Sequence, residues 1–251
     1  MTTSLDFVVP VLNEEQALTG SIDELAEFLG ASLPEYDWRI VIADNGSTDS
    51  TPDIACRLAS EQPRISYVRL EQRGRGRALR KAWLESRADI VGYTDVDLST
   101  DLAALVQMIK AVTEDGYDLA IGSRLRKGAR VIGRPLKREV VSRVYSLLFR
   151  TMFGTGFRDA QCGFKVLTRR VAKEVVPMVV DTGWFFDSEL LILAEKNGYR
   201  VKEVPVIWID DSDSRVRILN TAYGDLKGLL RLRFGGLRRV SRLLSKRGTN
   251  D

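Results

Sequence analysis

Two aspartates spaced one residue apart follow an apolar stretch in the segment Asp89–Thr100, DIVGYTDVDLST. The apolar residues predict a buried strand, and side chains two positions apart on a strand point to the same face. Asp95 and Asp97 should therefore project together. Two neighbouring carboxylates repel each other, so the pair favours either an exposed turn, where water screens both charges, or a divalent cation that the acids share with a phosphate. The spacing alone leaves both interpretations open.

Three other charged residues follow apolar runs in the same way. Glu14, Asp44 and Arg124 each come shortly after a predicted strand. Taken singly, each is a solvated loop charge. Taken together they should converge, because the carboxyl ends of parallel strands share one edge of a sheet.

Histidine is absent from the chain of 251 residues. Its absence excludes Ser-His-Asp and Cys-His catalysis, His-ligated zinc and acid–base chemistry by imidazole. The two cysteines, Cys56 and Cys162, are too few for a zinc site and indicate a reducing compartment rather than a disulfide framework. Chemistry must therefore depend on carboxylates, Arg, Lys, hydroxyls and an oxygen-binding metal.

Positive charge is concentrated in two blocks, although the formal net charge is only +4. Residues 124–150 contain nine Lys or Arg against one acid, Glu139, and residues 226–247 contain eight against none. Such blocks favour anionic partners: phosphates, nucleic acid or an anionic membrane surface. No run reaches the roughly 20 apolar residues of a membrane span, and the first residues do not have the pattern of a signal peptide, which predicts a cytoplasmic protein.

The elements that must position these residues alternate along the first half of the chain. Predicted strands lie in residues 5–10, 37–44, 64–70, 90–96 and 117–124, and predicted helices in 17–33, 52–62, 76–87 and 101–115. This order favours an α/β fold whose mostly parallel sheet has helices on both faces. Beyond Arg124 the alternation is irregular, with helices predicted over 136–154 and 183–198 and a strand over 199–209.

The common nucleotide-binding loops are missing from the expected places. A dinucleotide fold needs G-x-G-x-x-G after its first strand, where this chain has PVLNEE. The later RGRGRAL does not replace it, because Leu79 occupies the position of the third glycine. A P-loop is absent as well. Carboxylates in place of a phosphate-binding loop predict a transferase that handles a nucleoside diphosphate through a cation.

Several segments together resemble one known family. They are VVPVLNEE, ADNGSTDST, GRGRA, TDVDLST, IGSR, AQCGFKVLTR and GWFFDSELLILAEKNGYRVKEVPVIW, and they follow the family's order from about Phe7 to Arg215. The chain is thus similar to the family 2 glycosyltransferases of the polyprenyl-phosphate hexosyltransferase type. QCGFK with WFFDSELL is most similar to the dolichyl-phosphate β-glucosyltransferase branch, and the mannosyltransferase branch is close behind.

The resemblance implies a glycosyltransferase-A fold, which is a Rossmann-like α/β domain. It also implies transfer of one hexose, with inversion, from UDP-glucose or GDP-mannose to a polyprenyl or dolichyl monophosphate, with UDP-glucose favoured. Mg²⁺ or Mn²⁺ is the implied cofactor.

Individual residues receive implied roles from the same resemblance. Asp95 and Asp97 would form the metal motif, with Asp97 the better candidate for direct coordination. Arg124 would face the phosphates, while Arg138 and Ser142 would hold the acceptor phosphate. The implied nucleotide-sugar-binding residues are Pro10, Leu12, Asn13, Glu14, Asp44, Gly46, Arg77, Asp95, Val96, Asp97 and Arg124. The implied acceptor-binding residues are Arg124, Arg138, Ser142, Gly163 and Lys165.

One departure from the family pattern is Ser99, where mannosyltransferase relatives often carry Gln. It lowers the number of metal ligands and favours the glucosyl interpretation. The reaction itself needs no histidine, because a phosphate monoester has a second pKa of about 6 and is largely a dianion at neutral pH. The remaining barrier is the charge of two anions, which a cation on the acids and separate arginines would offset.

The two basic segments each have two interpretations. Residues 136–154 predict either a helix packed on the core with a solvated basic side, or an acceptor groove for an isoprenoid and its phosphate. In residues 218–251 apolar side chains keep helical spacing between basic ones, with a break at Gly235-Gly236, which favours an amphipathic hairpin on an anionic membrane surface. The alternative is a helix packed on the domain or an oligomer contact. The spaced apolar residues are Leu226, Leu230, Phe234, Leu237, Val240 and Leu244.

We therefore predict a catalytic domain over residues 1–217 and a membrane-associating tail over 218–251, with the enzyme peripheral on the inner face of the cell membrane. A glycosyltransferase with a soluble or protein acceptor is the nearest alternative, and the basic tail argues against it. A nucleic-acid-binding module is disfavoured, because the basic blocks lack regularly placed aromatic residues and any DNA-reading motif.

Overall fold

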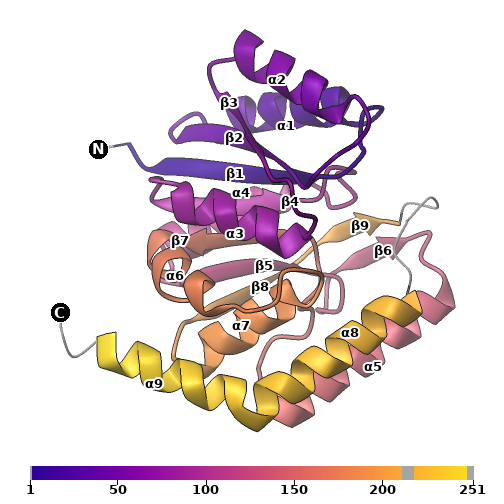
Figure 1. Cartoon of the computed structure of the whole chain (residues 1–251), viewed down its shortest axis with the longest axis vertical. Helices are drawn as coiled ribbons and strands as arrows, with labels where there is room; N and C mark the ends of the chain where they lie inside the picture. The colour runs from indigo at the N-terminus through magenta and orange to yellow at the C-terminus, as the bar shows by residue number, and fades with distance from the viewer. Residues whose placement is uncertain (1, 211–217, 248–251) are drawn as a thin grey trace.

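A seven-stranded sheet with the order β3-β2-β1-β4-β7-β5-β8 forms the centre of the molecule (Figure 1). The computed structural model describes the backbone of residues 2–210 and 218–247, and the side chains of 2–210 and 222–244. The predicted domain boundary at 217/218 borders residues outside this part. The sheet strands are β1 (Ser4–Val11), β2 (Asp37–Asp44), β3 (Ile65–Arg69), β4 (Ile90–Thr94), β5 (Leu119–Ser123), β7 (Phe164–Thr168) and β8 (Val201–Pro205).

The predicted alternation in the first half of the chain is confirmed. The strands β1 to β5 are joined by α1 (Leu18–Ser32), α2 (Thr51–Glu61), α3 (Arg75–Glu85) and α4 (Ala104–Thr113). Strands β3, β2, β1 and β4 pair in parallel, so their carboxyl ends lie at one edge of the sheet. The expected mixed, mostly parallel sheet with helices on both faces is therefore present.

Strand β7 has no counterpart among the predicted elements. It lies between β4 and β5 and runs antiparallel to both. Its insertion separates two strands that are neighbours in the sequence. The loop before β7 consequently reaches the edge where β4 ends, since an antiparallel strand starts where its neighbours finish.

Two apolar cores, one on each face of the sheet, hold the helices in place. Helices α1, α2 and α4 pack in one core. Helices α3, α5 (Leu136–Phe153), α6 (Arg169–Glu174) and α7 (Phe186–Lys196) pack in the other. Buried residues of the C-terminal helices, Leu229, Leu232 and Val240, belong to this second core.

The strand predicted over 199–209 is two strands, and this prediction needs correction. β8 ends at Pro205, and Val206 leaves the main sheet before β9 (Ile207–Ile209) pairs with β6 (Arg130–Ile132) in a separate two-stranded sheet. The amide of Val206 still donates to Ser123 O at 3.3 Å, while its carbonyl accepts from Arg130. The backbone therefore changes its hydrogen-bonding partner from β5 to β6 at a single residue, Val206.

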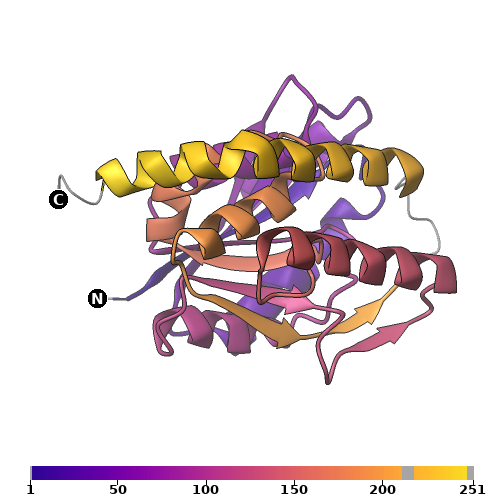
Figure 2. The ribbon, with the colours of Figure 1, turned by 90° about the horizontal axis from the view of Figure 1, so that it is seen from below.

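The C-terminal segment is a kinked pair of helices rather than the predicted hairpin. Helix α8 (Ile218–Arg231) passes through a π-helical turn (Leu232–Gly236) into α9 (Leu237–Arg247), with the kink at Gly235 as expected for the break. Figure 2 shows that α8 and α9 cross one face of the molecule without folding back. Burial of Leu229, Leu232 and Val240 explains this, because residues of both helices pack in the same core, and a helix α9 folded back on α8 would withdraw Val240 from it. No described helix combines the length and apolarity of a membrane span.

Candidate active site

Backbone and side-chain hydrogen bonds join the loops that follow β1 and β2. The amide of Asn13 donates to Ser47 Oγ at 3.0 Å, and the amide of Glu14 donates to Thr51 Oγ1 at 2.8 Å. Asp44 is fully buried beneath these loops and accepts from the amide of Ser47 at 2.9 Å. The structure thus brings Asn13, Glu14 and Asp44 together, and the carboxylate of Asp44 stabilises the turn that follows β2 by accepting from Ser47.

The other residues expected around the nucleoside lie at the same end of the sheet. Pro10 pairs with Ala43 in the β1–β2 ladder. Gly46 has φ +78°, and a side chain there would approach the carbonyl oxygens of Leu70 and Glu71 at 3.3 Å. The last three residues expected in this group are Leu12, Val96 and Arg77. Leu12 is half-buried and Val96 is buried. Arg77 lies on α3 and donates to Gln72 Oε1 at 2.5 Å.

The acidic pair does not lie on a strand, so the predicted strand over 90–96 is too long, and strand geometry does not set the direction of the two side chains. β4 ends at Thr94, and the amide of Leu98 donates to Asp95 O at 3.2 Å to close a turn. Leu98 adopts φ +46° in this turn. The carboxylate of Asp97 is exposed and accepts from the amide of Ser99 at 3.0 Å. The two acids still lie at the sheet edge, because the turn is too short to carry them away.

Asp95 is held against the loop before β7. Its amide donates to Gly163 O at 3.2 Å, and a Cβ atom on Gly163 would lie 1.7 Å from Asp95 Oδ2. Only glycine fits this position with the observed side chain. Gly163, expected to contact the acceptor, is therefore a direct support of the acidic turn.

A buried ionic network lies under the acidic turn. Arg75 bonds Asp95 Oδ1 at 2.7 Å and Asp187 Oδ2 at 2.6 Å. Asp187 also accepts from Tyr93 Oη at 2.7 Å and lies 3.1 Å from the Nζ atom of Lys165. Burial opposes the charge of Asp187, but Lys165 and Arg75 lower its pKa below the ordinary value. Lys165 is fully buried, so its position favours a supporting role in place of the expected contact with the acceptor.

The glycines of GRGRA allow close packing of the chain at the start of α3. A Cβ atom on Gly74, which has φ +148°, would lie 2.6 Å from Thr182 O, and one on Gly76 would lie 2.5 Å from Phe186 Cβ. The start of α3 can therefore approach α7 closely. This approach places Arg75, between the two glycines, against Asp187.

Arg124 follows β5 and is held by a buried acid. Its Nε and Nη2 atoms donate to the two carboxylate oxygens of Asp159 at 2.8 and 3.0 Å, and its guanidinium lies 4.7 Å from the centre of the Trp208 ring. Burial alone would raise the pKa of Asp159, but Arg124 lowers it to about 2. The guanidinium is thus fixed in orientation and permanently charged.

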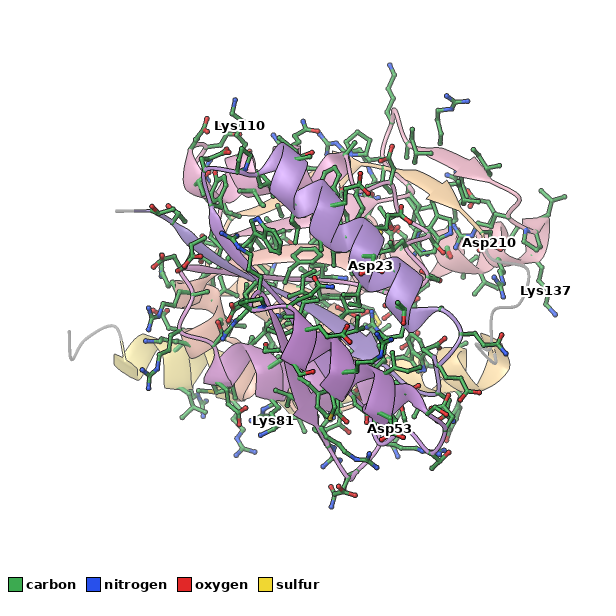
Figure 3. All side chains as sticks on the ribbon, turned by 90° about the horizontal axis from the view of Figure 1, so that it is seen from above. Asp23, Asp53, Lys81, Lys110, Lys137 and Asp210 are labelled. Carbon is green, nitrogen blue, oxygen red and sulfur yellow. The ribbon has the colours of Figure 1, made fainter. Side chains whose placement is uncertain are left out.

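A second arginine joins this region from the start of α5. Arg134 donates to Ser142 Oγ at 2.6 Å and to Glu139 at 3.1 Å, and Arg138 bonds Asp210 at 3.0 Å. Figure 3 shows Asp210 and Lys137 at the same end of the molecule, beside the start of this helix. Burial and the positive charge of Arg124 lower the pKa of Arg134.

The acidic turn (Asp95 to Ser99) and the arginine cluster (Arg124, Arg134 and Arg138) are linked by the loop over residues 159–163, in which Asp159 accepts from Arg124 and Gly163 accepts from the amide of Asp95. The charge of Asp95 acts on Arg124, and both act on the buried thiol of Cys162. Carboxylates that suit a cation and guanidinium groups that suit a phosphate therefore lie at the same edge of the sheet. Such an arrangement can hold two phosphate-bearing molecules in reach of each other.

Sequence reasoning missed Arg75, Asp187, Arg134 and Asp159. The motifs GRGRA and WFFDSELL contained the first two, but spacing does not tell which arginine of RGRGR faces the acids. Arg134 precedes the segment that drew attention, and Asp159 lies in an irregular loop. Each of these residues is recognised by its contacts with residues distant in the sequence, and no local sequence pattern indicates it.

Exposed apolar residues line two helices on one face of the molecule. Helix α5 buries Ser146, Phe149 and Phe153, and α8 buries Leu229. Figure 2 shows α5 and the α8–α9 pair on the same face. One side of α5 packs on the core, as the first interpretation of 136–154 expects, and the other side leaves apolar side chains in solvent; the acceptor groove stays a prediction. The exposed residues are Leu136, Val140, Val144 and Leu147 on α5, and Tyr223, Leu226 and Leu230 on α8, with Phe234 at the kink.

Residues 6–176 match the family model described as Glycosyl transferase family 2. The chain belongs to glycosyltransferase family 2. The match covers β1 to β7 and thus includes both the acidic turn and the arginine cluster.

Named relatives of this family 2 glycosyltransferase include Glycosyltransferase AglD of Haloferax volcanii, which is 37% identical over 225 residues, or 89% of this chain and 36% of the relative. Dolichyl-phosphate beta-glucosyltransferase ALG5C of Trichomonas vaginalis is 32% identical over 221 residues, covering 84% of this chain and 66% of the relative. The Saccharomyces cerevisiae dolichyl-phosphate beta-glucosyltransferase is 29% identical, covering 93% and 75%. The chain thus spans about a third of the first relative and about two thirds of the second.

Solved structures support the glycosyltransferase-A fold expected for the enzyme. Glucosyl-3-phosphoglycerate synthase from Mycobacterium tuberculosis in complex with UDP superposes with a TM-score of 0.70 at 20% identity, covering 92% of this chain and 80% of that chain. The complex of that protein with Mn²⁺ and UDP-glucose gives a TM-score of 0.68 at 18% identity, covering 93% and 79%. At this identity the likeness concerns the fold alone.

Proposed function

We propose that this family 2 glycosyltransferase moves glucose from UDP-glucose to a polyprenyl monophosphate of the dolichyl type, with inversion at the anomeric carbon. Several relatives carry the name dolichyl-phosphate beta-glucosyltransferase, and Ser99 departs from the mannosyltransferase pattern. The observation that carries the proposal is that one loop, residues 159–163, supports two oppositely charged sites: Asp159 accepts from Arg124, and Gly163 accepts from the amide of Asp95.

Asp95 and Asp97 fit a hard divalent cation such as Mg²⁺ or Mn²⁺. Their ligand atoms are carboxylate oxygens, which these ions prefer. The described residues contain no group of three or more His, Cys, Asp or Glu side chains arranged for a metal. An incomplete set of protein ligands is suited to a cation that is also bound by the diphosphate of a nucleotide. When bound, the cation supplies positive charge to the leaving diphosphate.

The donor nucleoside would lie on the joined loops of Asn13, Glu14 and Asp44, with Gly46 and Arg77 beside them. These residues share the carboxyl edge of β1 and β2, where open α/β sheets bind ligands. Their hydrogen bonds to each other keep the loops in place before the nucleotide arrives. The glucose would then lie between the acidic turn and the arginine cluster.

The acceptor phosphate would bind to Arg124, Arg138 and Ser142, with Arg134 between them. Its oxygen attacks the anomeric carbon as the bond to the diphosphate breaks, so no proton has to be removed from a phosphate dianion. Asp187 is unsuited to act as a base, because Arg75, Tyr93 and Lys165 already hold its charged carboxylate. The absence of histidine therefore does not slow the reaction.

The exposed apolar residues of α5 and α8 would place the enzyme on an anionic membrane surface, facing the cytoplasm. A polyprenyl chain is insoluble in water, so its phosphate must be met at the bilayer. Leu136 and Phe234 are 83% and 84% exposed, and basic residues flank both helices. In this proposal residues 1–217 catalyse the reaction and residues 218–251 assist membrane contact.

Radiolabelled UDP-glucose and GDP-mannose, offered separately with Mg²⁺ and a polyprenyl phosphate, test the proposal. We expect label from UDP-glucose to enter the organic phase, and label from GDP-mannose to enter it at a rate at least tenfold lower. A parallel reaction with a water-soluble phosphate monoester as acceptor should give little product. Equal transfer to the soluble acceptor would reject the lipid acceptor, and preference for GDP-mannose would reject the donor.

A further inference from the structure

The guanidinium of Arg75 is hydrogen-bonded to the carboxylate of Asp95, which is also a ligand of the proposed cation. Its Nη2 and Nε atoms lie 2.7 and 3.3 Å from Oδ1 of Asp95. Asp95 is the first acid of the turn, and its other oxygen, Oδ2, faces Gly163. A cation that approaches Asp95 therefore meets a positive charge already in place.

Arg75 is fixed in this position from several sides. Its side chain is 11% exposed and lies between the rings of Tyr93 and Trp184, at 4.8 and 5.2 Å from their centres. Its Nη1 atom bonds Asp187 at 2.6 Å. Burial opposes its charge, yet Asp95 and Asp187 keep the pKa of Arg75 well above the ordinary value.

The charges of this network are balanced without a metal. Arg75 and Lys165 provide two positive charges, and Asp95 and Asp187 provide two negative ones. A divalent cation bound by Asp95 and Asp97 alone would add two positive charges against the one further negative charge of Asp97, so an excess of positive charge would remain beside the buried Arg75. A nucleoside diphosphate carries at least two negative charges on its phosphates and would restore the balance.

We propose that Arg75 is a counter-ion switch that makes cation binding depend on the nucleotide. Without nucleotide, Arg75 holds Asp95 and opposes the cation. When the nucleotide enters, its diphosphate attracts Arg75 and releases Asp95 to the cation, so cation and donor bind as a unit. The inference rests on the proposed nucleotide site and does not depend on which acceptor is used.

Titration of the full chain with Mn²⁺, followed by electron paramagnetic resonance of the free ion, tests the switch with and without UDP. For the wild type we expect UDP to tighten Mn²⁺ binding at least tenfold. Arg75→Gln should bind Mn²⁺ alone about tenfold more tightly than the wild type, with a smaller gain from UDP. Arg75→Lys retains the charge and should stay closer to the wild type.

Lys81→Gln is the matched control, because it removes one positive charge from α3 at a residue that pairs with Glu85, at 2.5 Å. Lys81 lies on the periphery in Figure 3. This variant should bind Mn²⁺ like the wild type. Adding Asp95→Asn to Arg75→Gln should cancel the gain, since the released carboxylate is then gone.

A wild type that binds Mn²⁺ equally with and without UDP would overturn the switch. So would a folded Arg75→Gln protein, checked by circular dichroism, that gains no affinity for Mn²⁺. If Arg75→Gln does not fold, the wild-type comparison and Arg75→Lys decide. Failure of the proposed function has a different signature: UDP-dependent Mn²⁺ binding persists, but no label reaches the polyprenyl phosphate.

Discussion

Gly163 lies so close to Asp95 that a Cβ atom on it would be 1.7 Å from Asp95 Oδ2. Gly163→Ala should therefore push the carboxylate out of its position. We expect the transfer rate to fall by about two orders of magnitude, and the free energy of unfolding to fall by about 1–3 kcal/mol, as for other overpacked sites. Transfer assays and urea unfolding measure the two effects.

Gly20→Ala is the control for that substitution. Gly20 lies in α1, and a Cβ atom there would meet nothing within 4 Å. The change should stabilise the protein by about 0.5–1 kcal/mol, because alanine favours a helix more than glycine does. Normal activity in Gly163→Ala would show that Asp95 is not needed where the structure places it.

Arg134→Gln should weaken binding of the acceptor and leave the nucleotide unaffected. Arg134 bonds Ser142 and Glu139 and lies near Arg124, so its loss removes one charge-assisted contact, worth about 1.5–3 kcal/mol, from the proposed phosphate site. We expect KM for the polyprenyl phosphate to rise at least tenfold. Calorimetry should find Kd for UDP with Mn²⁺ unchanged.

Lys137→Gln serves as its matched control three residues further along the chain, in the first turn of α5, since Lys137 is exposed. It should change KM for the acceptor less than twofold. Equal losses of UDP and acceptor affinity in Arg134→Gln would place Arg134 outside an acceptor-specific site.

The sheet edge was predictable because its residues follow strands with clear apolar patterns. Asp44 ends β2, and Asp95 and Arg124 come directly after β4 and β5, so the order of strands and helices alone brings them to one edge. The turn geometry at Asp97 was not predictable, since it depends on a positive φ at Leu98, a residue type that rarely adopts one. The apolar pattern of the strands predicted where the acids lie, but it did not predict how their side chains are oriented.

The supporting residues were hidden for a different reason. Asp187 lies on α7, a helix buried on all sides, so periodicity does not distinguish a site residue from a core residue. Strand β7 is short and pairs only with strands remote in sequence. Lys165 on β7 reaches Asp187 only because β7 enters between β4 and β5. These contacts depend on tertiary packing, which a single sequence does not display.

Leu136→Ser combined with Phe234→Ser should weaken binding to vesicles that contain anionic lipid. Both side chains are exposed, and each fully buried apolar side chain contributes about 1.5–3 kcal/mol to transfer from water. We expect at least a tenfold lower partition coefficient in co-sedimentation. Deleting the chain after Tyr223 is a poorer test, because it would also remove Leu229, Leu232 and Val240 from the core.

Val106→Ser controls for loss of an exposed apolar residue on the other face. Val106 lies on α4, which packs against the opposite side of the sheet. Its substitution should leave vesicle binding unchanged. Equal partition of the double variant and the wild type would show that α5 and α8 do not contact the membrane.

Asp225 should make the protein less stable as pH rises from about 4 to about 6. It is buried on α8, it accepts a 2.6 Å bond from Gln161, and burial raises its pKa from 3.8 to about 6. The folded state therefore holds this proton more tightly than the unfolded state, and that advantage is lost as the group ionises. Asp225→Asn should be more stable than the wild type at pH 8, by up to about 2 kcal/mol, and similar at pH 4. Urea unfolding at the two pH values checks this, and a difference independent of pH would contradict it.

Transfer of label from UDP-glucose to polyprenyl phosphate by Asp97→Ala tests the central claim most directly. Asp97 is exposed, so its loss should leave the thermal unfolding curve unchanged. If the acids at the sheet edge act through a bound cation, the variant should transfer no label at any Mg²⁺ or Mn²⁺ concentration, while the wild type transfers it and stops in excess chelator. Full activity of Asp97→Ala in excess chelator would contradict the account.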